Sequence, residues 1–185
     1  MEQLDLRDRN KLFMEKVKKE NPGFFDELKK GQTPEYFLIS CSDSRVSPSV
    51  ITQTSLGEMF VHRNIANQVS LEDESLSASL YYALKHLKVK KIVVKGHTDC
   101  GGVKAAWNEN DEEELRGWIK GVRDSLPVKT DDTANLTVDE LTKYNVLSQV
   151  EKLKTHPVYI KYGAGVEISG CLFHVDTGEL EKITS

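Results

Sequence analysis

The chain has 185 residues, and 38% of them are hydrophobic, enough to bury the core of a single domain spanning residues 1–185. Acidic residues outnumber basic ones by 29 to 25, and the net charge of −4 argues against a nucleic-acid partner, which favours a basic surface. No stretch approaches the roughly 20 apolar residues of a membrane span, so we expect a cytoplasmic protein with no membrane partner.

The spacing of apolar residues predicts alternating helices and strands. In chain order, the predicted elements are a helix at 9–20 that Asn21-Pro22-Gly23 ends, strands at 36–40 and 58–64, a helix at 75–88, a strand at 90–97 and a helix start at 101–110. They continue with a mostly helical acidic stretch at 111–126, a turn-rich segment at 127–137, a helix at 138–156 broken by Pro157, and strands joined by glycine turns at 158–183. This alternation indicates an α/β fold with a mostly parallel β-sheet flanked by helices on both faces, preceded by an N-terminal helical arm.

Cysteine and histidine residues follow two of the predicted strands. Cys41 comes directly after the first strand, and His97 ends the third, with Cys100 three residues later. The backbone around them carries three glycines that would permit a tight turn: Gly96, Gly101 and Gly102. In open α/β sheets, ligands bind at the carboxyl ends of the strands. Two cysteines and one histidine form a three-ligand zinc set of the catalytic kind, with an open fourth position.

Each of these residues also has a purely structural interpretation. A single cysteine at a strand end is more often a small buried hydrophobic residue than a ligand, and one H-x-x-C pair is weak evidence for a metal. Cys171 is interpreted as a core thiol, and Asp99 is expected to be solvated. A cysteine phosphatase loop is excluded because Cys41 and Arg45 have three residues between them instead of five. A dinucleotide-binding G-x-G-x-x-G string is absent from the sequence.

Three blocks of the sequence, in this order and spacing, resemble the signature blocks of the β-class carbonic anhydrases: "CSDSRV" at 41–46, "FVHRNIAN" at 60–67 and "GHTDCGG" at 96–102. The similarity extends outward to residues 22–40 on one side and to residues 145–153 and 170–180 on the other. It therefore covers essentially the whole chain.

This resemblance implies that one zinc ion per chain is bound by Cys41, His97 and Cys100, and that Asp43 and Arg45 form the catalytic pair. For a plant-like member it also implies a substrate pocket built across a dimer interface, so that the protein is a dimer or a multiple of dimers. The residues expected to bind substrate are Gln32, Phe60 and Tyr82, to which we add Gly101.

The implied activity is the reversible hydration of carbon dioxide to bicarbonate and a proton, in which zinc-bound hydroxide attacks carbon dioxide. Arg45 can hold Asp43 through two hydrogen bonds and keep it ionised, and Asp43 can then orient the hydroxide. An ordinary salt bridge is the structural alternative for this pair. Two other functions stay open: hydrolysis of carbonyl sulfide or carbon disulfide at the same site, and a non-catalytic zinc or anion-binding module, against which the intact pair counts.

Overall fold

The computed structural model describes residues 4–184. The chain forms two compact units, Met1–Gln32 and Thr33–Ser185, which are described separately. The assignment of residues 1–185 to a single domain stays a prediction.

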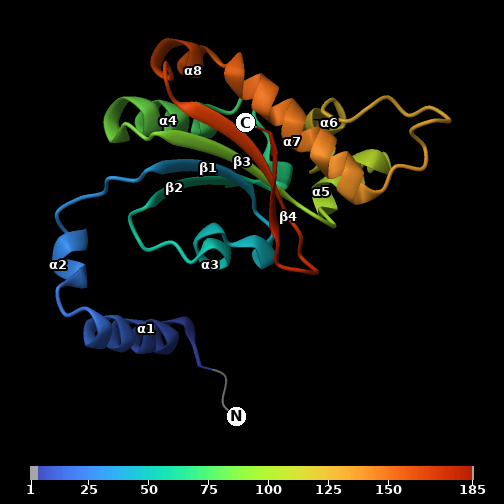
Figure 1. The fold of residues 1–185 in the computed structure, drawn as a ribbon. Coiled ribbons are helices and arrows are strands. Elements are labelled where there is room, and N and C mark those ends of the chain that lie inside the picture. Colours follow the sequence, from blue (N-terminus) through green and yellow to red (C-terminus); the bar gives the residue numbers. More distant parts are fainter. Residues whose placement is uncertain (1–3, 185) are drawn as a thin grey trace. The chain divides into compact units, whose positions relative to one another are not determined.

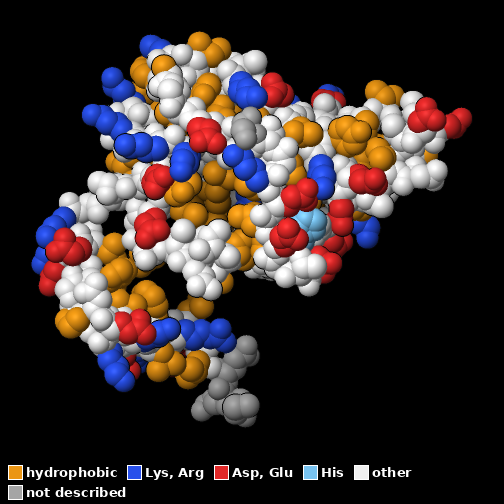
Figure 2. Space-filling model, viewed as in Figure 1, with side chains coloured by type: hydrophobic (Ala, Val, Ile, Leu, Met, Phe, Trp, Pro, Cys, Tyr) orange, Lys and Arg blue, Asp and Glu red, His pale blue; other side chains and the backbone are white. Residues whose placement is uncertain are grey.

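The first unit consists of two helices without a buried residue, α1 (Leu6–Glu20) and α2 (Phe24–Leu28). Asp5 caps α1 by accepting a hydrogen bond from the backbone N–H of Asp8 at 2.8 Å, and Asn21 ends the helix as predicted. Hydrophobic side chains of this unit lie on its surface among charged ones (Figure 2). Leu6 of α1 is 86% exposed and Leu12 is 55% exposed, so this helix has an apolar face that its own unit does not cover.

The second unit is built around a five-stranded sheet in the order β2-β1-β3-β4-β5. The strands are β1 (Tyr36–Cys41), β2 (Met59–Asn64), β3 (Lys91–His97), β4 (Glu167–Phe173) and β5 (Leu180–Thr184). The first four are parallel, and β5 pairs antiparallel with β4. The predicted mostly parallel sheet is therefore confirmed. The interior strand β1 is an almost continuous buried run, as expected for a strand covered on both faces.

Helices and short turns connect and cover these strands. They are η1 (Ser44–Val46), α3 (Pro48–Thr52), η2 (Ile65–Asn67), α4 (Glu74–Tyr81), η3 (Tyr82–Leu87), α5 (Gly101–Trp107), α6 (Arg116–Arg123), α7 (Val138–Lys154) and α8 (Pro157–Tyr162). In Figure 1, α7 and α8 lie above the sheet and α3 lies below it. The helix α7 packs on β3 and β4, and it begins with a capping box between Thr137 and Glu140.

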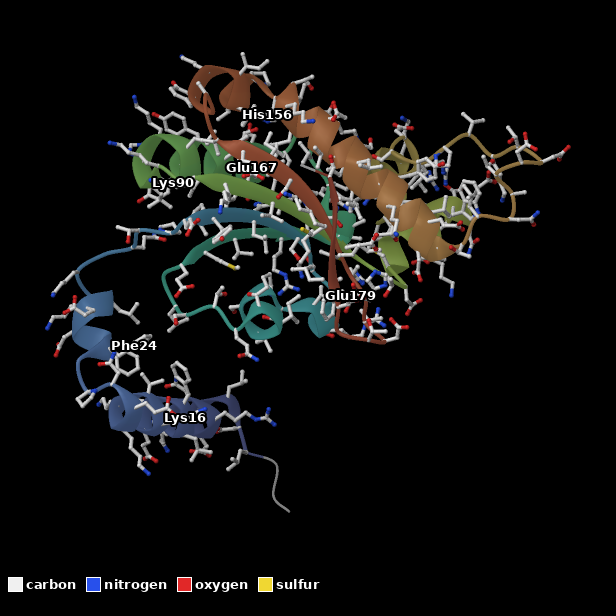
Figure 3. The ribbon with its side chains drawn as sticks, in the orientation of Figure 1. Lys16, Phe24, Lys90, His156, Glu167 and Glu179 are labelled. Carbon is white, nitrogen blue, oxygen red and sulfur yellow. The ribbon has the colours of Figure 1, made fainter. Side chains whose placement is uncertain are left out.

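The parallel strands β1 to β4 all begin at one edge of the sheet and end at the opposite edge, which we call the carboxyl edge. Lys90 and Glu167 lie at the amino ends of β3 and β4, whereas Glu179 lies near the turn that follows β4 (Figure 3). Cys41 and His97 are the last residues of β1 and β3, so both belong to the carboxyl edge. A hydrophobic cluster lies beneath this edge and includes Cys41, Val46, Ala66, Cys100, Val103, Ile119, Val122 and Leu141.

Two local predictions were wrong. The acidic stretch at 111–126 is helical only over Arg116–Arg123. Residues 157–162 form the helix α8 instead of a strand, because Pro157 occupies the first helical turn and the His156 side chain accepts the N–H of Val158 at 3.2 Å. The predicted break at Pro157 is present, and a new helix starts there.

No helix within residues 4–184 has both the length and the apolar character needed to cross a bilayer.

Candidate metal centre

Three buried side chains converge at the carboxyl edge of the sheet. Cys41 ends β1, His97 ends β3, and Cys100 is the residue that precedes α5. Their ligand atoms, two Sγ atoms and one imidazole nitrogen, all lie within 4.8 Å of one another. Cys41 is 5% exposed, and His97 and Cys100 are each 0% exposed, so all three side chains are buried. The structure thus brings together the three residues that the sequence singled out.

The hydrogen bonding of His97 leaves one ring nitrogen without a protein partner. Nδ1 lies 2.9 Å from the backbone oxygen of Thr98, which assigns the ring proton to Nδ1. Nε2 is buried and has no hydrogen-bond partner among the described residues. A buried acceptor without a partner is costly, and a bound metal ion would satisfy it. An imidazole oriented through its other nitrogen by a backbone carbonyl is typical of metal-bound histidine.

The two cysteines are also suited to bind a metal. The hydrogen bond from the Cys100 thiol lowers the pKa of Cys41, and the same bond raises the pKa of Cys100. The lowered pKa of Cys41 favours its thiolate, which is the form that binds metal. Two sulfurs and one imidazole nitrogen are the donors that Zn²⁺ takes in three-ligand sites. The residues present therefore fit one zinc ion.

A charged pair lies beside this group, in the turn that follows β1. Arg45 donates from Nε to Oδ1 of Asp43 at 3.0 Å and from Nη2 to Oδ2 at 2.8 Å. The backbone N–H of Arg45 also donates to Oδ1, at 2.9 Å. These bonds to Arg45 hold the pKa of Asp43 well below its usual value. Oδ2 of Asp43 lies 3.8 Å from Nε2 of His97, so the ionised carboxylate faces the three ligands.

Asp99 is a second carboxylate in contact with Arg45. Its Oδ2 accepts from Nη1 of Arg45 at 3.1 Å, and its backbone oxygen accepts from Nη2 at 3.2 Å. Asp99 has a φ of +54°, and its N–H donates to Asp139 of α7 at 2.9 Å. The sequence predicted only a solvated residue. The side chain is indeed 63% exposed, but it restrains the outer side of the guanidinium.

The backbone of the turn is fixed by two cations from the neighbouring strands. Arg63 of β2 donates to the carbonyl oxygens of Cys41 at 2.9 Å and Asp43 at 2.7 Å. Lys95 of β3 donates from Nζ to the carbonyl oxygen of Val46 at 2.8 Å. Neither cation was predicted to belong to the site. The signal was present for Lys95, since a lysine interrupts the apolar run of a strand that ends in a candidate ligand.

Comparisons with known proteins identify the family of this chain. The solved β-carbonic anhydrase CafA of Aspergillus fumigatus matches with a TM-score of 0.89 and 32% identity, over 95% of this chain and 88% of that one. The family model described as "Carbonic anhydrase" matches residues 36–180. This chain belongs to the β-class carbonic anhydrases.

Two further relatives extend the comparison. One of the two tetrameric β-carbonic anhydrases solved from Sordaria macrospora matches with a TM-score of 0.83 and 33% identity, over 95% of this chain and 93% of that one. A carbonic anhydrase of Emericella nidulans is 48% identical over 115 residues. That alignment covers 62% of this chain but only 50% of the relative, so this chain matches about half of the relative's length.

Two of the three glycines near the β-carbonic anhydrase ligands allow close packing. A Cβ on Gly96 would lie 2.5 Å from Cγ2 of Val146, and one on Gly102 would lie 2.6 Å from Cγ2 of Ile65. None of the three has a positive φ, so these positions do not need glycine for the tight turn that the sequence predicted. Gly101 has no neighbouring atom within 4 Å of its Cβ position, which leaves open space beside Cys100.

Two of the residues expected in a β-carbonic anhydrase pocket, Phe60 and Tyr82, lie away from the metal ligands within the second unit. Phe60 pairs with Phe37 in the register, four residues before Asn64, which pairs with Cys41. At roughly 3.3 Å per residue, Phe60 is about 13 Å from the carboxyl edge. The Tyr82 ring lies 5.8 Å from that of Phe60. Gln32 is exposed at the end of the first unit.

Proposed function

We propose that this β-carbonic anhydrase catalyses the reversible hydration of carbon dioxide to bicarbonate and a proton, with one zinc ion per chain held by Cys41, His97 and Cys100. The observation that carries the proposal is that an ionised carboxylate lies beside the three candidate zinc ligands. Three buried ligands suited to zinc lie beside an ionised Asp43 whose oxygen is 3.8 Å from His97. A non-catalytic zinc module has no use for a carboxylate fixed in that position.

Zinc, when bound, would supply the Lewis acidity that makes a water molecule nucleophilic near neutral pH. Asp43 would accept a hydrogen bond from this nucleophile and direct it at the carbon atom of carbon dioxide. Arg45 holds both oxygens of that carboxylate, so Asp43 stays ionised and cannot rotate freely. Because the Arg45 side chain is 46% exposed, the released proton has bulk water close by.

The direct test is to assay the zinc-loaded protein with two substrates side by side. We expect stopped-flow measurements to show hydration of carbon dioxide, with hydrolysis of carbonyl sulfide far slower. Preferred hydrolysis of carbonyl sulfide would assign the same site to the other activity. Zinc-loaded protein with neither activity would reject both and favour an anion-binding module.

We also propose that the protein is cytoplasmic and acts without a nucleic-acid or membrane partner. None of the three cysteines, Cys41, Cys100 and Cys171, is part of a disulfide, which suits a reducing compartment. The net charge of −4 suits a small-molecule substrate better than a nucleic acid.

A dimer, or a multiple of dimers, is the assembly we propose. The apolar face of α1 is uncovered, with Leu12 55% and Phe13 42% exposed, and a second copy of the chain would bury it. In such an assembly, Phe60, Tyr82 and Gln32 would line the pocket of the neighbouring subunit. The tetrameric relatives from Sordaria macrospora are compatible with this arrangement.

Mixing two inactive variants tests the shared pocket. We expect both Cys41→Ser and Tyr82→Ala to be impaired when assayed alone. When the two variants are mixed, dissociated and reassociated, half of the dimers contain one subunit of each kind. Each mixed dimer has one intact site out of two, so the mixture should regain about a quarter of the parent activity. Tyr82 is 44% exposed, so its truncation should leave the fold intact. Light scattering that shows an active monomer, or a mixture with no regained activity, would contradict the proposal.

A further inference from the structure

Lys95 is a buried cation that pairs with no carboxylate of residues 4–184. It lies in β3, between Ser40 of β1 and Cys171 of β4, and it is only 2% exposed. No salt bridge within residues 4–184 includes it. Lysine is almost never fully buried without a charged partner, because an ammonium group loses its hydration there. Such a residue needs a reason beyond the packing of the strand.

The contacts of Lys95 are with the turn that carries Asp43 and Arg45. Nζ donates to the carbonyl oxygen of Val46 at 2.8 Å, and the Phe173 ring lies 5.7 Å from Nζ. Val46 closes the turn, since its N–H donates to the carbonyl oxygen of Asp43 at 3.2 Å. The ammonium therefore holds the end of the turn against the sheet.

Lys95 and Arg63 approach this turn from opposite neighbours of β1. Arg63 comes from β2 and binds the carbonyl oxygens at the start of the turn, those of Cys41 and Asp43. Lys95 comes from β3 and binds the carbonyl oxygen at its end, that of Val46. The Asp43 side chain is thus presented to the ligands from a segment fixed at both ends. Loss of either anchor would free the backbone that aims this carboxylate.

We propose that Lys95 is a positioning residue, which fixes the turn at residues 41–46 so that Asp43 faces the metal ligands. Its effect on turnover rests on the proposed function, but its effect on the turn does not. An amine of this length reaches across from β3 to a carbonyl that a shorter side chain cannot bridge. The buried charge strengthens that hydrogen bond, because bonds from ionised donors are stronger than neutral ones.

The test compares Lys95→Met, which keeps the length of the side chain but removes the donor, with Lys91→Met. Lys91 lies on the same strand, but its side chain is 42% exposed and pairs with Glu35 at the other edge of the sheet. Hydrogen exchange of peptides that cover residues 42–48 should be about tenfold faster in Lys95→Met, the effect of losing one charge-assisted hydrogen bond. It should be unchanged in Lys91→Met.

Activity and zinc content then separate positioning from structure. We expect Lys95→Met to keep its zinc and to lose about tenfold in kcat with little change in KM. The double variant Lys95→Met/Asp43→Asn should be no slower than Asp43→Asn alone, because Lys95 acts through Asp43. Unchanged exchange at residues 42–48, unchanged kcat or fully additive losses would each overturn the proposal.

If Lys95→Met does not fold, Lys95→Gln is measured in its place, with the same criteria. If the parent protein does not hydrate carbon dioxide, the proposed function is rejected. The hydrogen-exchange data would still decide whether Lys95 holds the turn.

Discussion

Replacing Cys41 with serine is expected to remove most of the zinc and with it the activity. A serine hydroxyl stays protonated near neutral pH, so the variant offers two ligands where the parent offers three. Cys41 is 5% exposed, and its Sγ lies within 4.8 Å of the other two ligand atoms. We expect the zinc content, measured by elemental analysis, to fall from about one ion per chain to a small fraction of that.

Cys171→Ser is the matched control for this experiment. Cys171 lies in β4 and is not part of the ligand group, so its replacement should leave zinc content and activity at the parent level. Circular dichroism should show that both variants keep the fold. Full zinc retention in Cys41→Ser, or equal zinc loss in both variants, would remove Cys41 from the ligand set.

Removing the charge of Asp43 is expected to cost at least about tenfold in activity, since a positioned group that takes part in proton transfer typically contributes 10²–10⁴. Asp43→Asn keeps the shape of the side chain but changes one acceptor oxygen into a donor. Arg45→Ala removes the side-chain bonds at 3.0 and 2.8 Å and leaves the carboxylate held only by the backbone N–H of residue 45. Both variants should keep their zinc, and higher substrate concentrations should not rescue them.

Two further variants sharpen the result. Arg45→Lys should restore little activity, because an ammonium group cannot bind both oxygens of Asp43 in a plane and also reach Asp99. Asp111→Asn is the control, since Asp111 forms an Asp–Arg pair with Arg116 whose two side chains are 77% and 62% exposed. Exposed pairs of this kind contribute little, so this variant should match the parent. Parent-like turnover in Asp43→Asn would reduce the Asp43–Arg45 pair to a salt bridge.

Local patterns in the sequence predicted the strands and the ligand candidates. An apolar run that ends in Cys41 indicated a strand end, and the spacing of His97 and Cys100 indicated a turn into a helix. The pairing of Asp43 with Arg45 was also predictable, because residues two apart in a tight turn are close regardless of the rest of the fold. The same local reasoning failed for residues 158–162, where an apolar run resembled a strand but followed a proline that starts a helix.

Tertiary structure decided which of these local features meet. Cys41 and His97 converge because β1 and β3 are adjacent and parallel, an order that no local pattern specifies. The contacts that hold the turn join residues far apart in the sequence: Lys95 and Val46 are 49 positions apart, and Arg45 and Asp99 are 54 apart. A side chain's hydrogen-bond partner across such a distance depends on strand order and register. The sequence by itself therefore determined the residues that can bind zinc and orient a nucleophile. Only the packing of β2, β1 and β3 determined that Arg63 and Lys95 hold the backbone between them.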